Sequence, residues 1–411
     1  MLSSELLILG AGHAGVQVAA NLRQAQWQGS ITLIDNGTEY PYERPPLSKE
    51  VLNGDTTQTF SLRKPQFYED NRIELRLNST VTQILPEQRK VRFQNGQEYG
   101  YNTLVIATGA RARKLLIPGA QLPGVLSLRT REESEQLSAA LIPGKRVVIV
   151  GAGYIGMEVA AAAISAGCSV TVIEFQDRIM SRVTSPVVSE FFTELHQKQG
   201  VEFFFNESVS EFLGDTQLEA VLTASGKRFE ADLVVVGVGI VPNDELARDA
   251  GITTQDGILV DHQGRTSHPN IFAAGDVSKF DYVLDGSTIR LECIQNAVQQ
   301  AQQISRALSG NCEEVPAEVP WFWTVQHGVR LQTAGLWRPT DQIVVRKHPK
   351  PHSFSVLYLR EGKLAAIDTV NALGDFTQAK KLIAQGRIIN PERASDVRNK
   401  LNDAAELITV G

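Results

Sequence analysis

Apolar and polar positions at the start of the chain predict the order strand, turn, helix, strand. An apolar run at residues 5–9 stops at a glycine-rich turn, residues 10–15, and apolar residues at helical spacing continue to residue 22. A second apolar run, residues 30–34, ends on the acid Asp35. This spacing of strand, glycines, helix and acid is typical of a dinucleotide-binding unit.

The same pattern recurs near the middle of the chain. A strand at residues 145–150 leads into a second glycine-rich turn, residues 151–156, then a helix, and then a strand at 169–173 that ends on Glu174. A single glycine motif is weak evidence, because such turns also connect strands to helices without any ligand. Two complete copies, each with its own acid, predict one site for a flavin and one for a nicotinamide cofactor.

Three further patterns complete the outline of the fold. A buried strand at residues 101–109 ends in a small-residue turn that allows a ligand to approach the backbone. Residues 231–239 predict the strand that closes the second sheet, and residues 268–276 predict a buried strand whose end offers a carboxylate. Alternating residues 353–359, a polar turn at 360–363 and residues 364–367 predict a hairpin, with a helix following near residues 376–385. Residues 40–49 contain three prolines, so we expect an extended loop there.

The glycines and acids of the two units have predicted roles. Gly10 permits the tight turn, Gly12 lets backbone amides approach a pyrophosphate, and Gly15 allows the helix to pack on the strand. The diphosphate then lies at the positive helix N-terminus. A carboxylate at Glu174 binds a free ribose 2′-hydroxyl and repels a 2′-phosphate, which favours NADH over NADPH, although Arg178 and Arg182 lie nearby in sequence.

Composition narrows the class of protein. A chain of 411 residues predicts two or three domains, and a net charge of -6 argues against general nucleic-acid binding. We expect no membrane span and no signal peptide, and hence a cytoplasmic protein. The three cysteines, Cys168, Cys293 and Cys312, lack CxxC spacing, so we expect neither a disulfide framework nor a metal site.

The chain resembles the NADH-dependent ferredoxin reductases of oxygenase systems, the family of the putidaredoxin, rubredoxin and biphenyl-dioxygenase ferredoxin reductases. The resemblance spans nearly the whole sequence. It depends on residues 44–49, Arg-Pro-Pro-Leu-Ser-Lys, on the turn at 151–158, on residues 290–292 and 295–297, and on Trp-Phe-Trp at 321–323.

This resemblance implies the ligands of both sites. The first fingerprint and its surroundings hold FAD, which implicates Gly10, Gly12, His13, Ala14, Gly15, Asp35, Arg44, Lys49, Val81, Ala107, Thr108, Gly109, Arg129, Gly275, Asp276 and Ile294. The second holds NADH, which implicates Gly151, Gly153, Tyr154, Ile155, Gly156, Glu158, Glu174, Arg182, Gly237 and Gly239. Lys49 and Glu158 are the candidate catalytic residues, as an ion pair beside the flavin.

The implied fold class is α/β, with two Rossmann-like dinucleotide-binding domains of glutathione-reductase type and a smaller C-terminal α+β domain. We expect a discontinuous FAD domain at residues 1–115 and 240–319, an NADH domain at 116–239 and the C-terminal domain at 320–411. The sequence departs from the family after Trp323, where the family usually reads Ser-Asp-Gln and this chain has Thr324-Val325-Gln326, followed by His327-Gly328 where an aromatic residue is common.

The implied reaction passes hydride from NADH to FAD and then single electrons to a small [2Fe-2S] ferredoxin. A rubredoxin or an atypical ferredoxin is the main alternative acceptor, because Val325 replaces the family's acid, and we expect a monomer or weak homodimer. A basic face for an acidic carrier would draw on Arg63, Lys64, Arg330 and Arg338. A disulfide reductase, or a related NADH oxidase or peroxidase, is disfavoured because no cysteine precedes Cys168. A non-enzymatic NADH sensor also stays open.

Overall fold

The computed structural model describes residues 3–54, 60–284, 286–310 and 318–405. The chain forms two compact units, each assembled from separate segments. The first unit comprises residues 1–43, 58–111 and 240–318, and the second comprises 44–57, 112–239 and 319–411. Among the described residues, no helix is long and apolar enough to cross a bilayer.

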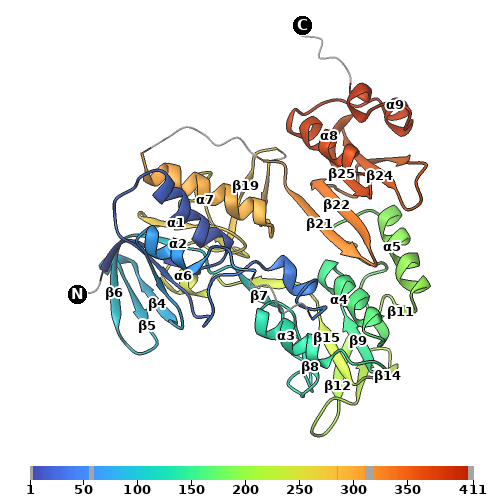
Figure 1. Cartoon of the computed structure of the whole chain (residues 1–411), viewed down its shortest axis with the longest axis horizontal. Helices are drawn as coiled ribbons and strands as arrows, with labels where there is room; N and C mark the ends of the chain where they lie inside the picture. The colour runs from blue at the N-terminus through green and yellow to red at the C-terminus, as the bar shows by residue number, and fades with distance from the viewer. Residues whose placement is uncertain (1–2, 55–59, 285, 311–317, 406–411) are drawn as a thin grey trace. The chain divides into compact units, whose positions relative to one another are not determined.

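A seven-stranded sheet forms the centre of the first unit (Figure 1). Its parallel strands are β1 (Ser3–Leu9), β2 (Ile31–Ile34), β3 (Ile73–Arg76), β6 (Glu98–Ile106) and β18 (Ile271–Ala273), and β4 (Val81–Leu85) and β5 (Lys90–Phe93) extend it in antiparallel fashion. Leu6 and Ile8 of β1 pack in one apolar cluster, whereas Leu7 and Leu9 pack in another. Both faces of the sheet are therefore covered, which explains why β1 is a continuous apolar run rather than an alternating one.

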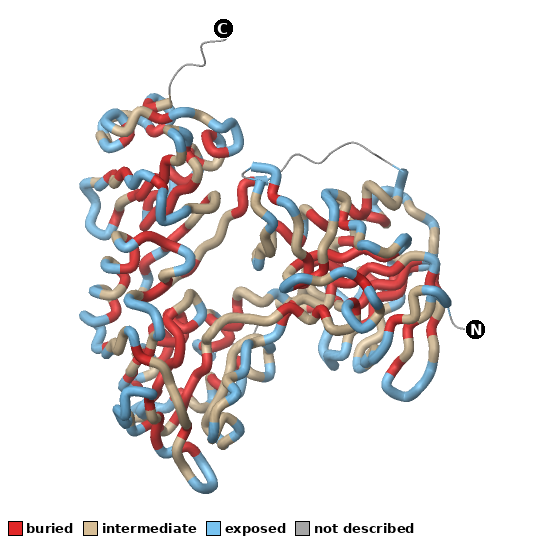
Figure 2. The backbone as a smooth tube through the Cα atoms, turned by 180° about the vertical axis from the view of Figure 1, so that it is seen from behind, coloured by how far each residue is buried: buried red, intermediate tan, exposed pale blue. Residues whose placement is uncertain are grey.

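Two long helices cover one face of this sheet. They are α1 (His13–Gln24) and α7 (Ile294–Leu308), which pack against each other around Val18 and Ala301. Figure 2 shows the strands beneath them as a band of buried backbone. The remaining elements of this unit are α2 (Pro65–Asp70), η2 (Pro86–Gln88), α6 (Glu245–Asp249), β17 (Ile258–Leu259), β19 (Ser278–Tyr282) and β20 (Ser287–Ile289), and β7 (Ala110–Ala112) pairs with β16 (Ile240–Pro242).

The second unit repeats the strand, turn, helix arrangement in a five-stranded parallel sheet. The strand order is β11 (Val201–Phe204), β10 (Ser169–Ile173), β9 (Arg146–Val150), β15 (Leu233–Val236), β8 (Val125–Leu126). Its helices are α3 (Arg131–Ala140), α4 (Tyr154–Ser165) and α5 (Pro186–Lys198), and a small antiparallel sheet consists of β12 (Val209–Leu213), β13 (Ala220–Thr223) and β14 (Arg228–Glu230).

An antiparallel sheet from the C-terminal residues completes the second unit. Its order is β21 (Trp321–Gln326), β22 (Val329–Gly335), β25 (Lys363–Val370), β24 (Phe354–Arg360), β23 (Gln342–Lys347), and α8 (Leu373–Ala384), α9 (Pro391–Ser395) and η3 (Leu401–Ala404) accompany it. The predicted hairpin is β24 and β25, and the predicted helix is α8. The fold class expected from the sequence is confirmed: an α/β chain with two Rossmann-like units and a smaller C-terminal α+β region.

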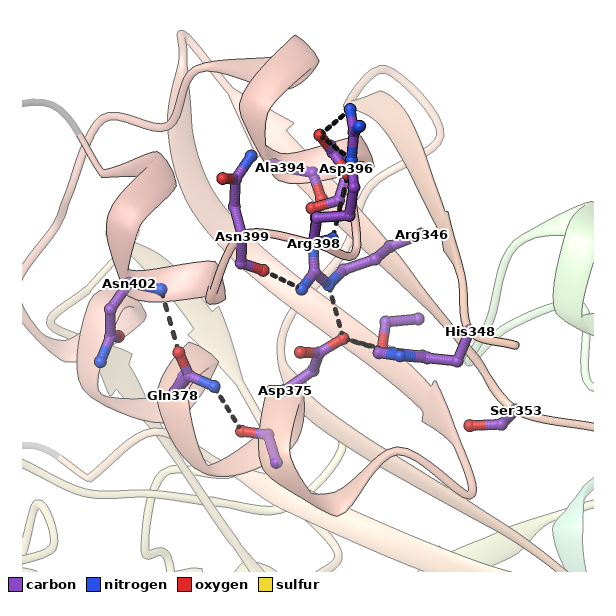
Figure 3. Close-up of polar contacts among 12 residues, drawn as sticks. Arg346, His348, Ser353, Asp375, Gln378, Ala394, Asp396, Arg398, Asn399 and Asn402 are labelled. Atoms are coloured by element: carbon purple, nitrogen blue, oxygen red, sulfur yellow. Dashed lines mark hydrogen bonds and ion pairs between the residues drawn. The ribbon is translucent and has the colours of Figure 1, made fainter. Parts of the chain in front are cut away.

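A buried arginine fixes the last described segment of the chain (Figure 3). The Arg346 guanidinium donates to the Asp375 carboxylate at 3.0 Å and to the carbonyls of Ala394 and Asp396 at 2.9 and 2.7 Å. His348 Nε2 lies 2.8 Å from the same carboxylate oxygen. Because all of these groups belong to the C-terminal sheet, α8 and the α9 region, Arg346 holds these elements together.

One expectation about local structure was incomplete. Residues 45–48 form a single turn of 3-10 helix, η1 (Pro45–Ser48), inside the loop that we expected to be extended. The two prolines occupy the first positions of this turn, where their fixed φ fits a helix and their missing N–H groups cost no hydrogen bond.

Candidate functional site

The glycines of the first turn occupy three different environments. Gly10 has φ of +99°, and a Cβ there would lie 2.3 Å from the carbonyl oxygen of Ala107. A Cβ on Gly15 would lie 2.0 Å from the carbonyl oxygen of Gly10. Gly12, in contrast, meets no described atom within 4 Å, and it is the N-cap of α1. The turn is therefore tight at Gly10 and Gly15 and open at Gly12, which is the arrangement that a diphosphate at the N-terminus of α1 requires.

Asp35 is held against this turn. Its carboxylate accepts hydrogen bonds from the backbone N–H groups of Ala11, at 2.7 Å, and Gly37, at 2.8 Å. The backbone carbonyl of Asp35 accepts from Ser79 N–H at 2.9 Å, two residues before Val81 begins β4. The structure thus brings Asp35, the glycine turn and the segment leading into Val81 together within the first unit.

The turn after β6 is fixed by a residue that sequence reasoning missed. Thr108 Oγ1 donates to the carbonyl of Asn243 at 2.8 Å, and the Asn243 side chain donates to the carbonyl of Thr108 at 2.8 Å. Asn243 N–H also donates to the carbonyl of Gly109, which has φ of +65°. No local spacing in the sequence identifies Asn243, because its partner turn lies more than 130 positions earlier.

A second missed residue, Gln300, holds the turn after β18. Its side-chain oxygen accepts from Gly275 N–H at 2.8 Å and from Ser278 Oγ at 2.9 Å. A Cβ on Gly275 would lie 3.1 Å from that of Ala14, so this turn lies beside the start of α1, where His13 is also found. Asp276 follows Gly275 and is half-buried, and Ile294 is the first residue of α7.

The second glycine turn has the same geometry as the first. Gly151 has φ of +100°, and a Cβ there would lie 2.6 Å from the carbonyl oxygen of Gly237. Gly156 is packed against the carbonyl of Gly151, whereas Gly153 has open space among the described atoms within 4 Å. The Glu174 carboxylate accepts from Ala152 N–H at 2.6 Å and from Gln176 N–H at 2.8 Å. This turn also fits a diphosphate at a helix N-terminus, that of α4.

The two arginines near Glu174 differ in their surroundings. Arg178 donates to the carbonyls of Thr184 and Ser181 and to Ser189 Oγ, and burial lowers the pKa of its guanidinium. Arg182 instead lies beside Gly239, because a Cβ on Gly239 would lie 3.4 Å from Arg182 Nη2. Gly239 closely follows Gly237, whose carbonyl packs against Gly151. Arg182 is therefore the better placed of the two to influence a nucleotide.

Glu158, on α4, is the buried acid of the second unit. It is 3% exposed, and its carboxylate accepts from Lys49 Nζ at 2.9 Å, from Thr324 Oγ1 at 2.7 Å and from the Ser48 hydroxyl. The predicted Lys49–Glu158 ion pair is thus formed within this unit. Thr324 and Ser48 were not among the predicted site residues, although Thr324 stands at a position where the sequence departs from its family.

The loop that contains Lys49 is anchored on two helices of the second unit. Arg44 donates to the carbonyl of Arg129 at 3.0 Å, which brings these two predicted residues together. Ser134 of α3 donates to the carbonyl of Leu47 at 2.5 Å. These contacts, with those of Ser48 and Lys49 to α4, fix the position of the Lys49 ammonium.

Aromatic residues flank the start of α4. The ring of Tyr154 stacks on Phe322 of β21, with centroids 4.5 Å apart and planes at 23°. Ile155 is 40% exposed beside it, and Phe175, directly after Glu174, is 70% exposed.

The described cysteines are shielded from reaction. Burial raises the pKa of the Cys293 thiol to about 11, and burial also raises that of Cys168. Cys312 lies outside the described residues. Of the predicted carrier-binding residues, Arg63 and Lys64 belong to the first unit, and Arg330 and Arg338 are exposed in the second.

Comparison with known proteins places this geometry in a family. Residues 4–301 match the model described as pyridine nucleotide-disulphide oxidoreductase, and residues 321–405 match the model described as reductase C-terminal. A ferredoxin–NAD(P)(+) reductase of Sphingomonas sp. is 40% identical over 391 residues, 94% of this chain and 94% of that protein. A rubredoxin–NAD(+) reductase of Pseudomonas putida is 37% identical, over 89% of this chain and 95% of that protein.

A solved structure agrees with these matches. The reductase in the crystal structure of the covalent putidaredoxin reductase–putidaredoxin complex superposes with a TM-score of 0.94 at 36% identity, covering 98% of both chains. With two glycine turns of equal geometry and a matching C-terminal region, the chain belongs to the pyridine nucleotide-disulphide oxidoreductase family, in the branch that ends in a reductase C-terminal domain.

Proposed function

We propose that this protein takes hydride from NADH onto FAD and passes the electrons singly to a small iron-sulfur ferredoxin that supplies an oxygenase. The observation that carries the proposal is the pair of glycine turns, each open at its middle glycine and each held by an acid. Relatives named as ferredoxin, putidaredoxin and rubredoxin reductases match over nearly the whole chain and support the same activity.

We assign FAD to the first glycine turn and NADH to the second. In the first unit, the FAD residues are Gly10, Gly12, His13, Ala14, Gly15, Asp35, Val81, Ala107, Thr108, Gly109, Gly275, Asp276 and Ile294. Asn243 and Gln300 support them by fixing two of the turns. Arg44, Lys49 and Arg129, which the second unit contains, complete the proposed FAD set.

The NADH residues proposed in the second unit are Gly151, Gly153, Tyr154, Ile155, Gly156, Glu158, Glu174, Arg182, Gly237 and Gly239. The Glu174 carboxylate accepts hydrogen bonds from the ribose hydroxyls, and Glu158 orders the nicotinamide amide. We also propose the division into a FAD domain at 1–115 and 240–319, an NADH domain at 116–239 and a C-terminal domain at 320–411.

Bound FAD would supply the hydride acceptor and the one-electron donor of the reaction. The protein orients the cofactors rather than acting as a nucleophile. Lys49 supplies positive charge where negative charge develops, and its ion pair with Glu158 sets the position of the ammonium. The buried Glu158 carboxylate, held by three side chains, keeps one orientation toward its ligand.

The acceptor and the compartment belong to the same proposal. A ferredoxin is our first candidate and a rubredoxin the second, since both kinds of reductase are among the relatives. We place the reaction in the cytoplasm and expect a monomer or weak homodimer. A non-enzymatic NADH sensor is the alternative from a different class.

The test begins with the purified protein. We expect one FAD per chain, a yellow colour, and rapid NADH-dependent reduction of ferricyanide. A folded, colourless protein that takes up no FAD would contradict the flavin assignment, and a yellow protein that NADH does not reduce would favour the sensor.

A further inference from the structure

A continuous line of hydrogen bonds leads from Glu158 to the tip of the β21–β22 hairpin. Thr324 Oγ1 lies 2.7 Å from Glu158 Oε1, and Gln326 Nε2 lies 3.2 Å from Thr324 Oγ1. Gln326 Oε1 is 2.9 Å from His196 Nε2, and His196 Nδ1 is 3.0 Å from His327 Nε2. We call Thr324, Gln326, His196 and His327 the relay. Three of its members come from one hairpin and His196 comes from α5.

The carboxylate fixes the direction of every bond in the relay. An ionised Glu158 only accepts, so the Thr324 hydroxyl donates to it and can only accept from Gln326. The amide nitrogen of Gln326 therefore faces Thr324, and its oxygen faces His196. That oxygen requires a proton on His196 Nε2, which leaves Nδ1 of the neutral ring as an acceptor for His327 Nε2–H. All four donors thus point toward Glu158.

Burial maintains this arrangement. Thr324, Gln326 and His196 are each fully buried. Burial lowers the pKa of His196 to about 4, so this ring is neutral at neutral pH, and burial also lowers the pKa of the half-buried His327. The ring of Phe203 packs edge-on against His196. Aligned hydrogen bonds polarise one another, which strengthens the final bond to the carboxylate.

We propose that the relay residues are positioning residues for the reductase reaction, which hold the Glu158 carboxylate in the orientation that receives the nicotinamide. This inference rests on the proposed function, because it assumes that Glu158 contacts the nucleotide. Lys49 and Ser48 donate hydrogen bonds only to Oε2 of the carboxylate, whereas Thr324 donates to Oε1. Thr324 is therefore the described side chain that sets the rotation of the group from the Oε1 side.

The chain offers variants that remove single links. Thr324→Val removes the hydroxyl while keeping the shape, and Thr324→Ser retains the hydroxyl. Thr369→Val is the matched control, since Thr369 is a buried threonine of the same sheet that donates to the carbonyl of Gln332. His327→Asn removes the imidazole without harming the hairpin. His327 and Gly328 both have positive φ, +49° and +76°, and Asn-Gly is favoured in such two-residue turns.

The first measurement is the dissociation constant of NAD+ on the oxidised, FAD-containing protein, by calorimetry. We expect Thr324→Val to weaken binding about ten-fold, as loss of a hydrogen bond to a charged group predicts. Thr324→Ser and Thr369→Val should stay within about two-fold of the parent protein, because the first keeps the donor and the second lies outside the relay. Unchanged binding by Thr324→Val would overturn the proposal.

The second measurement is nitrogen NMR of the protein labelled at its seven histidines, with His196 assigned by its substitution. We expect His196 as the neutral ring with its proton on Nε2 at pH 7, and we expect the His196 signals to change in Thr324→Val and His327→Asn but not in Thr369→Val. A proton on Nδ1 of His196, with Nε2 bare, would overturn the relay even if Thr324→Val fails to fold. Failure of the parent protein to bind NAD+ would instead contradict the proposed function.

Discussion

At the scale of single residues, cofactor preference depends on one acid and one arginine. Glu174 follows the second unit's β10 and is fixed by two backbone N–H groups. Arg178 is engaged by two carbonyls and a serine, so Arg182 is the cation that could offset Glu174. We expect higher kcat/KM for NADH than for NADPH.

Glu174→Ala should narrow this preference. Loss of hydrogen bonds from a carboxylate corresponds to about ten- to one hundred-fold in kcat/KM for NADH. Arg182→Ala should leave the preference for NADH at least as strong. Steady-state kinetics with both nucleotides measure the two effects, and equal use of NADPH by the parent protein would show that Arg182 outweighs the acid.

The cysteines should be dispensable for the reductase activity, because burial keeps the described thiols in their unreactive, protonated form. Replacing Cys168, Cys293 and Cys312 together by Ala or Ser should leave NADH-to-ferricyanide activity within about two-fold, since raised thiol pKa values keep Cys168 and Cys293 protonated at neutral pH. A thousandfold loss in a folded triple variant that retains FAD would restore the disulfide-reductase hypothesis.

How far the sequence predicts the site differs from residue to residue. The roles of Gly10 and Gly15 follow from local backbone geometry, and the structure gives each the tight packing that the pattern predicts. Asn243 and Gln300 contact turns formed by distant segments, so no local spacing identifies them. Whether the predicted ligand residues bind cofactors stays a prediction.

At the scale of elements, a buried carboxylate connects the C-terminal sheet to the start of α5. Asp368 of β25 accepts from Tyr358 of β24 at 2.5 Å and from the Thr184 hydroxyl. Tyr358 also contacts Ser185, the N-cap of α5. Burial raises the pKa of Asp368 to about 7, against the lowering effect of its hydrogen bonds.

This carboxyl should make stability depend on pH. Because its folded pKa lies above its unfolded value, its contribution is fully present below about pH 4 and is lost as pH rises through about 7. Asp368→Asn removes the titration. As pH rises from 4 to 7, the free energy of unfolding of the variant should therefore rise relative to that of the parent protein, by about 4 kcal/mol at most. Urea unfolding across this range measures the difference, and a constant difference would contradict the raised pKa.

His196 makes stability depend on pH in the opposite direction. Its folded pKa is lowered to about 4, so its contribution is present above about pH 6.5 and is lost as pH falls toward 4. In the parent protein, the effects of Asp368 and His196 on stability oppose each other over the same pH range. The pH dependence of Asp368→Asn should therefore be steeper, with stability rising with pH.

Elements were more predictable than their contacts. The two strand-turn-helix units, the C-terminal hairpin and α8 follow from apolar periodicity, and all are present. The 3-10 turn at residues 45–48 escaped prediction because its prolines suit both an extended loop and a helix start. The docking of Tyr358 on Ser185 joins elements 173 positions apart, which no periodicity shows.

At the scale of the whole molecule, net charge bears on the acceptor. The chain carries a net charge of -6. An acidic ferredoxin docks through basic residues, so the reductase needs a local basic face. Arg330 and Arg338 are exposed on the C-terminal part of the second unit, near Val325 in sequence. They are our candidates on that unit, with Arg63 and Lys64 on the first.

Electrostatic docking predicts that carrier reduction at low carrier concentration falls steeply as salt rises. Arg330→Glu or Arg338→Glu should weaken carrier reduction several-fold without changing ferricyanide reduction, since the flavin chemistry is untouched. Arg228→Glu on β14 changes the net charge equally and is the matched control. Steady-state assays with ferredoxins and rubredoxins over a salt series measure each effect. If ferricyanide is reduced rapidly but every iron-sulfur carrier is refused, the reductase assignment stands and the ferredoxin partner is wrong; if only rubredoxins are accepted, the alternative acceptor is the correct one.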